Sequence, residues 1–172
     1  MLDLKTLIRD APDFPKPGVT FKDITPLLAD PAGLALCVET MANPWRGRGI
    51  ELVCGAESRG FIFGTAIAQS LSAGFVPIRK PGKLPGATRK VTYDLEYGTD
   101  TLEMQANAVR PGQRVLMVDD LLATGGTLRA CLDLLRELGA DVAGVSLAIE
   151  LTFLKGRERV GADVSVDAAI VY

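Results

Sequence analysis

The sequence predicts an α/β fold of the doubly wound kind, with a mainly parallel sheet flanked by helices. Short apolar runs, which suit strands buried on both faces, alternate along the chain with longer segments of helical character. Two strand-loop-helix units are especially clear: residues 115–118 lead through a loop to the leucine-rich residues 128–138, and residues 50–54 lead through a loop to residues 61–71. A proline-rich segment and a basic segment interrupt this alternation. We expect both to be additions to the sheet.

The composition is that of one globular domain, residues 1–172, with 48% hydrophobic and 23% charged residues. A net charge of −2 gives no basic field, so we expect no nucleic-acid partner and no membrane partner. The first ten residues are charged and amphipathic, unlike a signal peptide, which predicts a cytoplasmic location. Cys37, Cys54 and Cys131 are far apart in the sequence and are expected to be buried, reduced thiols.

The chain contains no histidine, which limits the chemistry open to it. Ser-His-Asp and Cys-His catalysis, histidine-ligated zinc and histidine acid–base chemistry are all excluded. Any proton transfer must therefore use a carboxylate, a lysine, a tyrosine or water.

The N-terminal residues 1–30 are expected to form a hood or flap. Apolar residues recur at near-helical spacing over residues 2–8 and predict a short amphipathic helix before Pro12. Residues 13–26 contain three prolines and predict an irregular segment. Phe21 in this segment could stack on a planar base, or it could simply pin the flap to the core, which is the commoner role for such a residue.

A helix is expected from Pro31 to about Met41, then a loop over residues 44–49 and a strand over residues 50–54. The loop over residues 55–60 precedes the helix of residues 61–71. Backbone amides, Ser58 and Arg59 at that helix N-terminus predict an oxyanion site, although a plain turn with a serine cap is the alternative.

Residues 75–78 predict a strand, and a basic loop over residues 79–90 follows it. Five cations among twelve residues suit either a solvated surface loop or a lid that closes over a polyphosphate and excludes water. Residues 91–97 alternate as a strand does and are expected to pair with residues 101–104. Residues 79–104 are thus predicted to form a flexible catalytic loop and a mobile hairpin.

The segment VLMVDDLLATGGT, residues 115–127, carries the strongest functional signal. Ligands bind beyond the carboxyl ends of strands in open α/β sheets, which is where the loop after the strand of residues 115–118 would lie. Small residues let successive amides converge on a phosphate at a helix N-terminus, with threonine hydroxyls as further donors. Asp119 and Asp120 would accept from sugar hydroxyls or from a hydrated divalent cation. The segment predicts a cradle for ribose 5-phosphate; the alternative is an acidic turn.

The remaining elements are a buried strand over residues 140–149, a turn or short helix over residues 151–159, and terminal strand material over residues 164–166 and 168–172. We assign no role to the residues after Arg159.

Together, these motifs resemble the adenine-specific members of the type I phosphoribosyltransferase family. The phosphate segment is shared across that family, whereas adenine specificity is carried by FPKPGVTFKDITP at 14–26, ESRGFIFG at 57–64, IRKPGKLPG at 78–86 and LEYG at 95–98. The resemblance spans Pro12 to Arg159. Glu57 stands where some members carry aspartate, and Lys22 where they carry arginine, without change of charge.

The resemblance implies transfer of phosphoribose from phosphoribosyl pyrophosphate to adenine, with Mg²⁺, in a homodimer. Mg²⁺ would be held by substrate and water, with no direct protein ligand and with Asp119 and Asp120 near its waters. Adenine would contact Phe21 and the backbone of Lys22, and Glu96 would handle the proton beside Tyr97 and Arg59. A non-proline cis peptide is expected between Glu57 and Ser58. The implied contacts of phosphoribosyl pyrophosphate are Asp119, Asp120, Ala123, Thr124, Gly125, Gly126, Thr127, Glu57, Ser58, Arg59, Arg79, Lys80 and Lys83.

Three alternatives are kept beside this interpretation. A sister enzyme acting on another purine would share the phosphate chemistry. A regulator that binds nucleic acid and keeps the sugar-phosphate site is disfavoured by the absence of a basic face. A dinucleotide-binding dehydrogenase is disfavoured because no G-x-G-x-x-G follows a strand.

Overall fold

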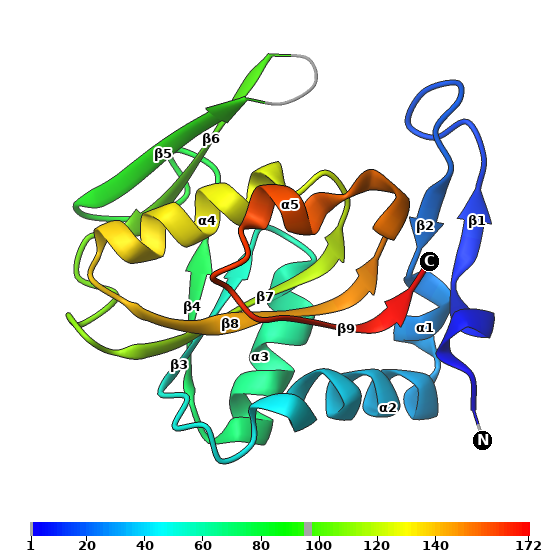
Figure 1. The fold of residues 1–172 in the computed structure, drawn as a ribbon, viewed down its shortest axis with the longest axis horizontal. Helices are drawn as coiled ribbons and strands as arrows, with labels where there is room; N and C mark the ends of the chain where they lie inside the picture. The colour runs from blue at the N-terminus through cyan, green and yellow to red at the C-terminus, as the bar shows by residue number, and fades with distance from the viewer. Residues whose placement is uncertain (1, 95–97) are drawn as a thin grey trace.

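The central layer of the protein is a five-stranded, wholly parallel sheet (Figure 1). The computed structural model describes residues 2–94 and 98–172. The strand order is β4-β3-β7-β8-β9, so in chain order the sheet runs 2-1-3-4-5 and its direction of winding reverses between β3 and β7. The prediction of a doubly wound α/β fold is confirmed. The strands are β3 (Leu52–Ala56), β4 (Gly74–Ile78), β7 (Arg114–Leu122), β8 (Asp141–Glu150) and β9 (Val166–Val171).

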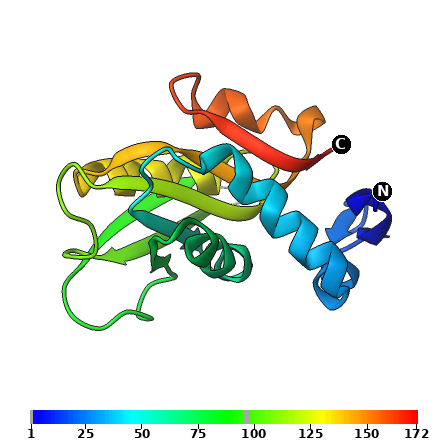
Figure 2. The same ribbon diagram turned by 90° about the horizontal axis from the view of Figure 1, so that it is seen from below.

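Helices cover both faces of this sheet, as the view from below shows (Figure 2). On one face lie α1 (Thr25–Ala29), α2 (Pro31–Ala42) and α3 (Gly60–Leu71); on the other lie α4 (Gly126–Glu137) and α5 (Gly156–Val160). The start of α2 follows from its sequence, because Asp30 accepts from the Gly33 amide at 2.7 Å and Pro31 opens the helix. No helix of the described residues is long and apolar enough to cross a bilayer.

The N-terminal segment contains more regular structure than expected. The predicted helix is a short 3-10 helix, η1 (Leu4–Leu7), and it leads into β1 (Arg9–Ala11), which pairs antiparallel with β2 (Phe21–Asp23). The prediction of a wholly irregular segment at 13–26 was therefore wrong for its second half. Cross-strand ion pairs, Arg9 with Asp23 and Lys22 with Asp10, compensate for the small apolar content of this two-stranded ribbon.

The predicted hairpin is present with other strand bounds: the first strand begins at residue 88 rather than 91, the second spans residues 99–105 rather than 101–104, and residues 95–97 of the expected first strand lie outside the described residues. It consists of β5 (Thr88–Asp94) and β6 (Thr99–Gln105), which pair antiparallel from Thr88 opposite Gln105 to Asp94 opposite Thr99. The strand begins at Thr88 because β6 continues to Gln105 and offers partners there. The expected basic loop at 79–90 is shortened accordingly.

The strand that enters the phosphate segment is also longer than expected. Apolar content predicted an end at residue 118, but β7 continues to Leu122 because Leu121 and Leu122 pair with the last residues of β8, Ile149 and Glu150. Asp119 and Asp120 consequently belong to the strand, the loop shrinks to residues 123–125, and α4 begins at Gly126 rather than at residue 128.

Past β8, the predicted turn or short helix is confirmed as η3 (Thr152–Leu154) and α5. The two predicted terminal strand pieces are one strand, β9, which starts at Val166. The last residues of β9 lie beside the N-terminal ribbon (Figure 1).

Candidate active site

A polar cavity of about 360 Å³ lies where the sheet reverses its winding. β3 and β7 are neighbours, so the loops that follow them share one edge of the sheet, as expected for a ligand site in this fold. The structure therefore brings together the two loops that the sequence marked as anion sites. The cavity is lined by Glu57, Ser58, Arg59, Asp119, Asp120, Leu121, Leu122, Ala123, Thr124, Gly125, Gly126, Thr127 and Leu128.

The loop before α4 has a conformation that requires glycine. Gly125 has a φ of 84°, and a Cβ at this position would lie 2.4 Å from the carbonyl oxygen of Gly156 in α5. Among residues 2–94 and 98–172, no side chain caps the N-terminus of α4. The amides of its first turn are thus left for an anion, and the helix dipole favours negative charge there.

The two carboxylates at the end of β7 differ in their surroundings. Asp120 is paired with Arg59 at 2.5 Å, whereas Asp119 accepts from the Asp120 amide at 2.9 Å. Both are buried. Burial, and then the neighbouring charge of Asp120, raise the pKa of Asp119 well above its usual value, and the charge of Arg59 opposes this. The charged form of Asp119 is therefore disfavoured in the free protein, and a hydroxyl donor or a cation beside it would favour that form.

The loop after β3 has the expected backbone. The peptide between Glu57 and Ser58 is cis, which confirms that prediction. The Glu57 carboxylate accepts from the Lys80 amide at 2.9 Å and from Arg79 Nε at 3.2 Å, and these contacts lower the pKa of Glu57. Glu57 thus joins this loop to the start of the basic loop.

The three cations expected around a pyrophosphate lie beside the cavity rather than in its lining. Arg79 is held by Glu57 and also donates to the Lys83 carbonyl at 3.2 Å, while Lys80 forms an ion pair with Asp100 of β6. Arg79, Lys80 and Lys83 line neither of the two cavities described for this protein. Each of the first two is paired with a carboxylate of the protein itself.

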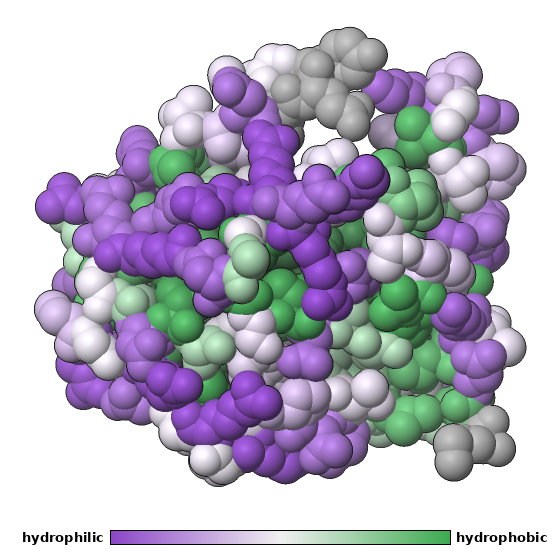
Figure 3. Space-filling view, in the orientation of Figure 1, coloured by the Kyte–Doolittle hydropathy of each residue, from purple (hydrophilic) through white to green (hydrophobic). Residues whose placement is uncertain are grey.

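A second, more apolar cavity of about 680 Å³ adjoins the first and shares a wall with it. Leu121, Ala123, Thr124, Gly126 and Thr127 line both. The space-filling view shows hydrophobic side chains gathered on the side of the molecule that faces the N-terminal ribbon (Figure 3). The other residues that line the second cavity are Gly18, Val19, Thr20, Phe21, Lys22, Asp94, Leu151, Phe153 and Leu154.

Phe21 contributes to this second cavity while remaining anchored. Its ring meets Phe14 edge-on with centroids 5.3 Å apart, and the Arg59 guanidinium lies 5.2 Å from its centroid. The side chain of Lys22 is 13% exposed and pairs with Asp10 at 2.7 Å. Among the described residues β2 pairs with β1 alone, so the second edge of β2 carries backbone groups that no strand uses.

Glu96 and Tyr97, expected as proton-handling residues, lie outside the described residues. Asp94, the last residue of β5, lines the apolar cavity. Sequence reasoning assigned it no role.

Other lining and contact residues also escaped the sequence analysis. Leu121 was taken for loop and is strand. Leu151, Phe153 and Leu154 follow the carboxyl end of β8, so the strand-end rule that located the phosphate loop would have found them too. Tyr93 Oη lies 3.2 Å from Thr127 Oγ1 and 3.2 Å from Asp100 Oδ2, a long-range contact with no local sequence signal.

The fold and the paired cavities correspond to a known class. Residues 25–166 match the family model described as "Phosphoribosyl transferase domain". A relative from Acidobacterium capsulatum, "Adenine phosphoribosyltransferase", is 59% identical over 91% of this chain and 86% of that protein. The crystal structure of adenine phosphoribosyltransferase from Rhodothermus marinus has a TM-score of 0.94 at 50% identity and covers 98% of this chain and 96% of its own.

A third comparison comes from a structure with a base analogue. The APRTase from Giardia lamblia complexed with 9-deazaadenine has a TM-score of 0.94 at 40% identity, covering 99% of this chain and 96% of that one. The chain belongs to the adenine phosphoribosyltransferases, within the wider phosphoribosyltransferase family.

We predict that Asp119→Asn stabilises the protein at neutral pH and weakens sugar-phosphate binding. Since the folded-state pKa of Asp119 is raised, the folded protein binds this proton more tightly than the unfolded chain. The contribution of Asp119 to stability therefore falls as pH rises from about 4 through the raised pKa. Loss of a charged acceptor should weaken binding of phosphoribosyl pyrophosphate about 10- to 100-fold.

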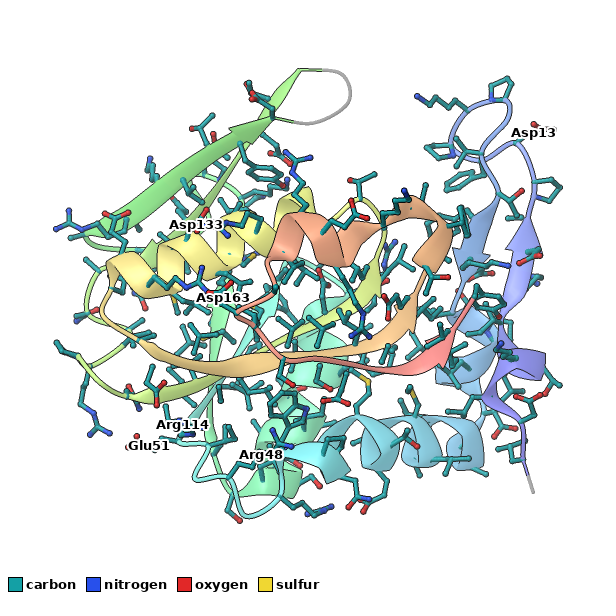
Figure 4. All side chains as sticks on the ribbon, viewed as in Figure 1. Asp13, Arg48, Glu51, Arg114, Asp133 and Asp163 are labelled. Atoms are coloured by element: carbon teal, nitrogen blue, oxygen red, sulfur yellow. The ribbon has the colours of Figure 1, made fainter. Side chains whose placement is uncertain are left out.

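Thermal unfolding from pH 5 to 8 and titration calorimetry would measure these two effects. The matched control is Asp133→Asn, because Asp133 lies on α4 (Figure 4) and lines neither cavity. Its side chain is half exposed and pairs with Arg129 at 2.8 Å. A lower melting temperature of Asp119→Asn than of the wild type at pH 8 would contradict the burial argument.

Proposed function

We propose that the protein transfers the 5-phosphoribosyl group from phosphoribosyl pyrophosphate to adenine, giving AMP and pyrophosphate. The observation that carries this is the shared wall between the two cavities. Displacement at C1 of the ribose requires the base on one side of the sugar and pyrophosphate on the other. A polar cavity with an anion-binding helix terminus beside an aromatic, apolar cavity provides that arrangement.

The sugar phosphate would occupy the shared wall. The 5′-phosphate would be held by backbone amides and threonine hydroxyls of Ala123, Thr124, Gly125, Gly126 and Thr127. Asp119 and Asp120 would accept from the ribose hydroxyls. Hydroxyl donors would favour the charged form of Asp119, which burial disfavours in the free protein.

Pyrophosphate would lie against the loop of Glu57, Ser58 and Arg59. Arg79, Lys80 and Lys83 would complete the anion clamp, and Arg79 and Lys80 would exchange Glu57 and Asp100 for phosphate oxygens. The reaction builds negative charge on this leaving group and positive charge on the sugar, so donors fixed around the pyrophosphate lower the barrier. Removing one such donor typically costs about 3–4 kcal/mol.

Mg²⁺ fits this donor set as an ion held by the substrate. No group of three or more Asp, Glu or Cys residues in the described chain could form a protein cage for a metal. The ion typically keeps several waters and binds through one or two carboxylates plus substrate phosphates. Asp119 and Asp120 would accept from its waters. When bound, the ion neutralises charge on the departing pyrophosphate.

Adenine would enter the apolar cavity between the ribbon and Leu121. The ring of Phe21 would stack on the base. The half-buried Arg59 guanidinium, which lines the polar cavity, makes a cation–π contact with that ring. The Lys22 side chain is engaged by Asp10, so recognition by this residue would use its backbone at the open edge of β2. Backbone amide and carbonyl groups match the donor and acceptor pattern on the edge of an adenine ring.

The N9 proton of adenine must leave during the reaction, and we assign its removal to Glu96. The chain has no histidine, so a carboxylate, a lysine, a tyrosine or water must take the proton, and the family resemblance implies the carboxylate of Glu96. Tyr97 and Arg59 would act beside it on the developing charge.

The proposal extends to organisation. Residues 1–172 would act as one phosphoribosyltransferase domain, with a hood at 1–30, a flexible catalytic loop and hairpin at 79–104, and assembly as a homodimer. Cys37, Cys54 and Cys131 are free and buried, which suits the reducing cytoplasm. No nucleic acid and no membrane is assigned as a partner.

We predict turnover with adenine far above that with hypoxanthine, guanine or xanthine, because the backbone edge of β2 and the apolar wall accept the adenine pattern. A coupled assay of pyrophosphate release across the four bases would measure this, and chelation of Mg²⁺ should stop it. Equal turnover of all four bases would favour the sister-enzyme alternative. No pyrophosphate release with any base would revive the non-catalytic alternative.

We also predict that Glu96→Gln lowers kcat about 10²- to 10⁴-fold, the usual value of general-base catalysis, with little change in KM for phosphoribosyl pyrophosphate. The matched control is Asp94→Asn, which removes the neighbouring carboxylate that lines the apolar cavity. Steady-state kinetics and the pH dependence of kcat would compare the two. A larger loss in Asp94→Asn than in Glu96→Gln would move the proton-handling role to Asp94.

A further inference from the structure

Two walls of the apolar cavity come from segments far apart in the sequence, so contacts between those segments must set the distance between the walls. One wall is the ribbon residues Thr20, Phe21 and Lys22; the other is the segment that contains Leu151, Phe153 and Leu154. No residue of one wall is a sequence neighbour of the other. The width of the cavity therefore depends on what joins these segments.

Tyr172 contacts both segments. Its backbone continues the sheet, because the Tyr172 amide donates to the Glu150 carbonyl at 2.9 Å and the Thr152 amide donates to the Tyr172 carbonyl at 2.9 Å. The Thr152 hydroxyl donates to the same carbonyl. These bonds fix the start of η3, which carries Phe153 and Leu154.

The ring of Tyr172 holds the ribbon. The Lys22 ammonium lies 4.0 Å from the ring centroid, and the Lys5 ammonium lies 5.0 Å from it. Burial raises the pKa of Tyr172 despite the opposing charge of Lys22, so the ring is a neutral phenol at physiological pH. A cation placed over such a ring is attracted by its quadrupole, more strongly where water is excluded. Lys22 is mostly shielded from water, and Asp10 holds the same ammonium at 2.7 Å.

We propose that Tyr172 is a positioning residue for base recognition, which sets the separation of the two walls by holding Lys22 through its ring and residue 152 through its backbone. The inference rests on the proposed function, in which adenine lies between these walls. The ring holds the end of the Lys22 side chain, so that the backbone of Lys22 would face the base at a fixed distance. Weakening the contact would loosen adenine binding and leave the phosphate loop unchanged.

The kinetic test compares Tyr172→Leu with the wild type. Loss of the ring should raise KM for adenine about 5- to 30-fold, while KM for phosphoribosyl pyrophosphate and kcat at saturating substrates stay within about twofold. Tyr172→Phe keeps the ring and should behave as the wild type. A residue that merely stabilised the C-terminal strand would instead change both KM values and the active fraction together.

A double-mutant cycle isolates the contact. Lys22→Met should raise KM for adenine by a similar factor, and Lys22→Met with Tyr172→Leu should be no worse than either single variant, because both remove the same interaction. Lys5→Met is the matched control: it removes the more distant cation over the same ring, from a residue that lines neither cavity, and should leave KM for adenine within about twofold.

The outcomes separate this inference from the proposed function. A wild-type protein that does not turn over adenine contradicts the proposed function. A wild-type protein that turns over adenine, with an unchanged KM for adenine in Tyr172→Leu or with additive effects in the cycle, overturns the role of Tyr172. If Tyr172→Leu does not fold, Lys22→Met tests the same contact from the other side, and an unchanged KM for adenine there overturns the proposal.

Discussion

The site depends on the close approach of two backbones, that of the loop before α4 and that of the first turn of α5. Gly125 lies against the Gly156 carbonyl, and a Cβ on Gly156 would in turn lie 2.3 Å from the Ala123 carbonyl. Neither position has room for a side chain. This contact fixes the loop so that the uncapped amides of α4 face the polar cavity, where they would donate hydrogen bonds to an anion. The rest of the site is arranged around that anion position.

Three cations at the site already form ion pairs within the free protein. Arg59 is held by Asp120, Arg79 by Glu57 and Lys80 by Asp100. Unpaired charges at partly buried positions would be costly, so each of these three cations has a carboxylate partner before substrate arrives. Under the proposed function, pyrophosphate would bind these cations in place of their carboxylates. Asp120 would then be free for a ribose hydroxyl or for the waters of the metal, so binding exchanges one set of ion pairs for another.

The sequence predicted what depends on local pattern. Alternation of apolar runs and helical segments predicted the sheet, and the glycines and threonines after Asp120 predicted the phosphate loop. Features that depend on distant partners were missed. β7 extends to Leu122 because β8 pairs with it, and the ribbon strand at Phe21 exists because β1 lies beside it. The contact of Tyr172 with Lys22 joins residues 150 positions apart, which no local pattern encodes.

The central claim is that the N-terminus of α4 binds the monophosphate of an activated sugar. Titration of isotope-labelled protein with ribose 5-phosphate, followed by amide chemical shifts, tests it most directly. The account predicts that the amides of Gly125, Gly126 and Thr127 shift most, in a saturable manner, and that Gly125→Ala abolishes the effect. Saturable shifts centred on another part of the molecule, with these three amides unmoved, would contradict it.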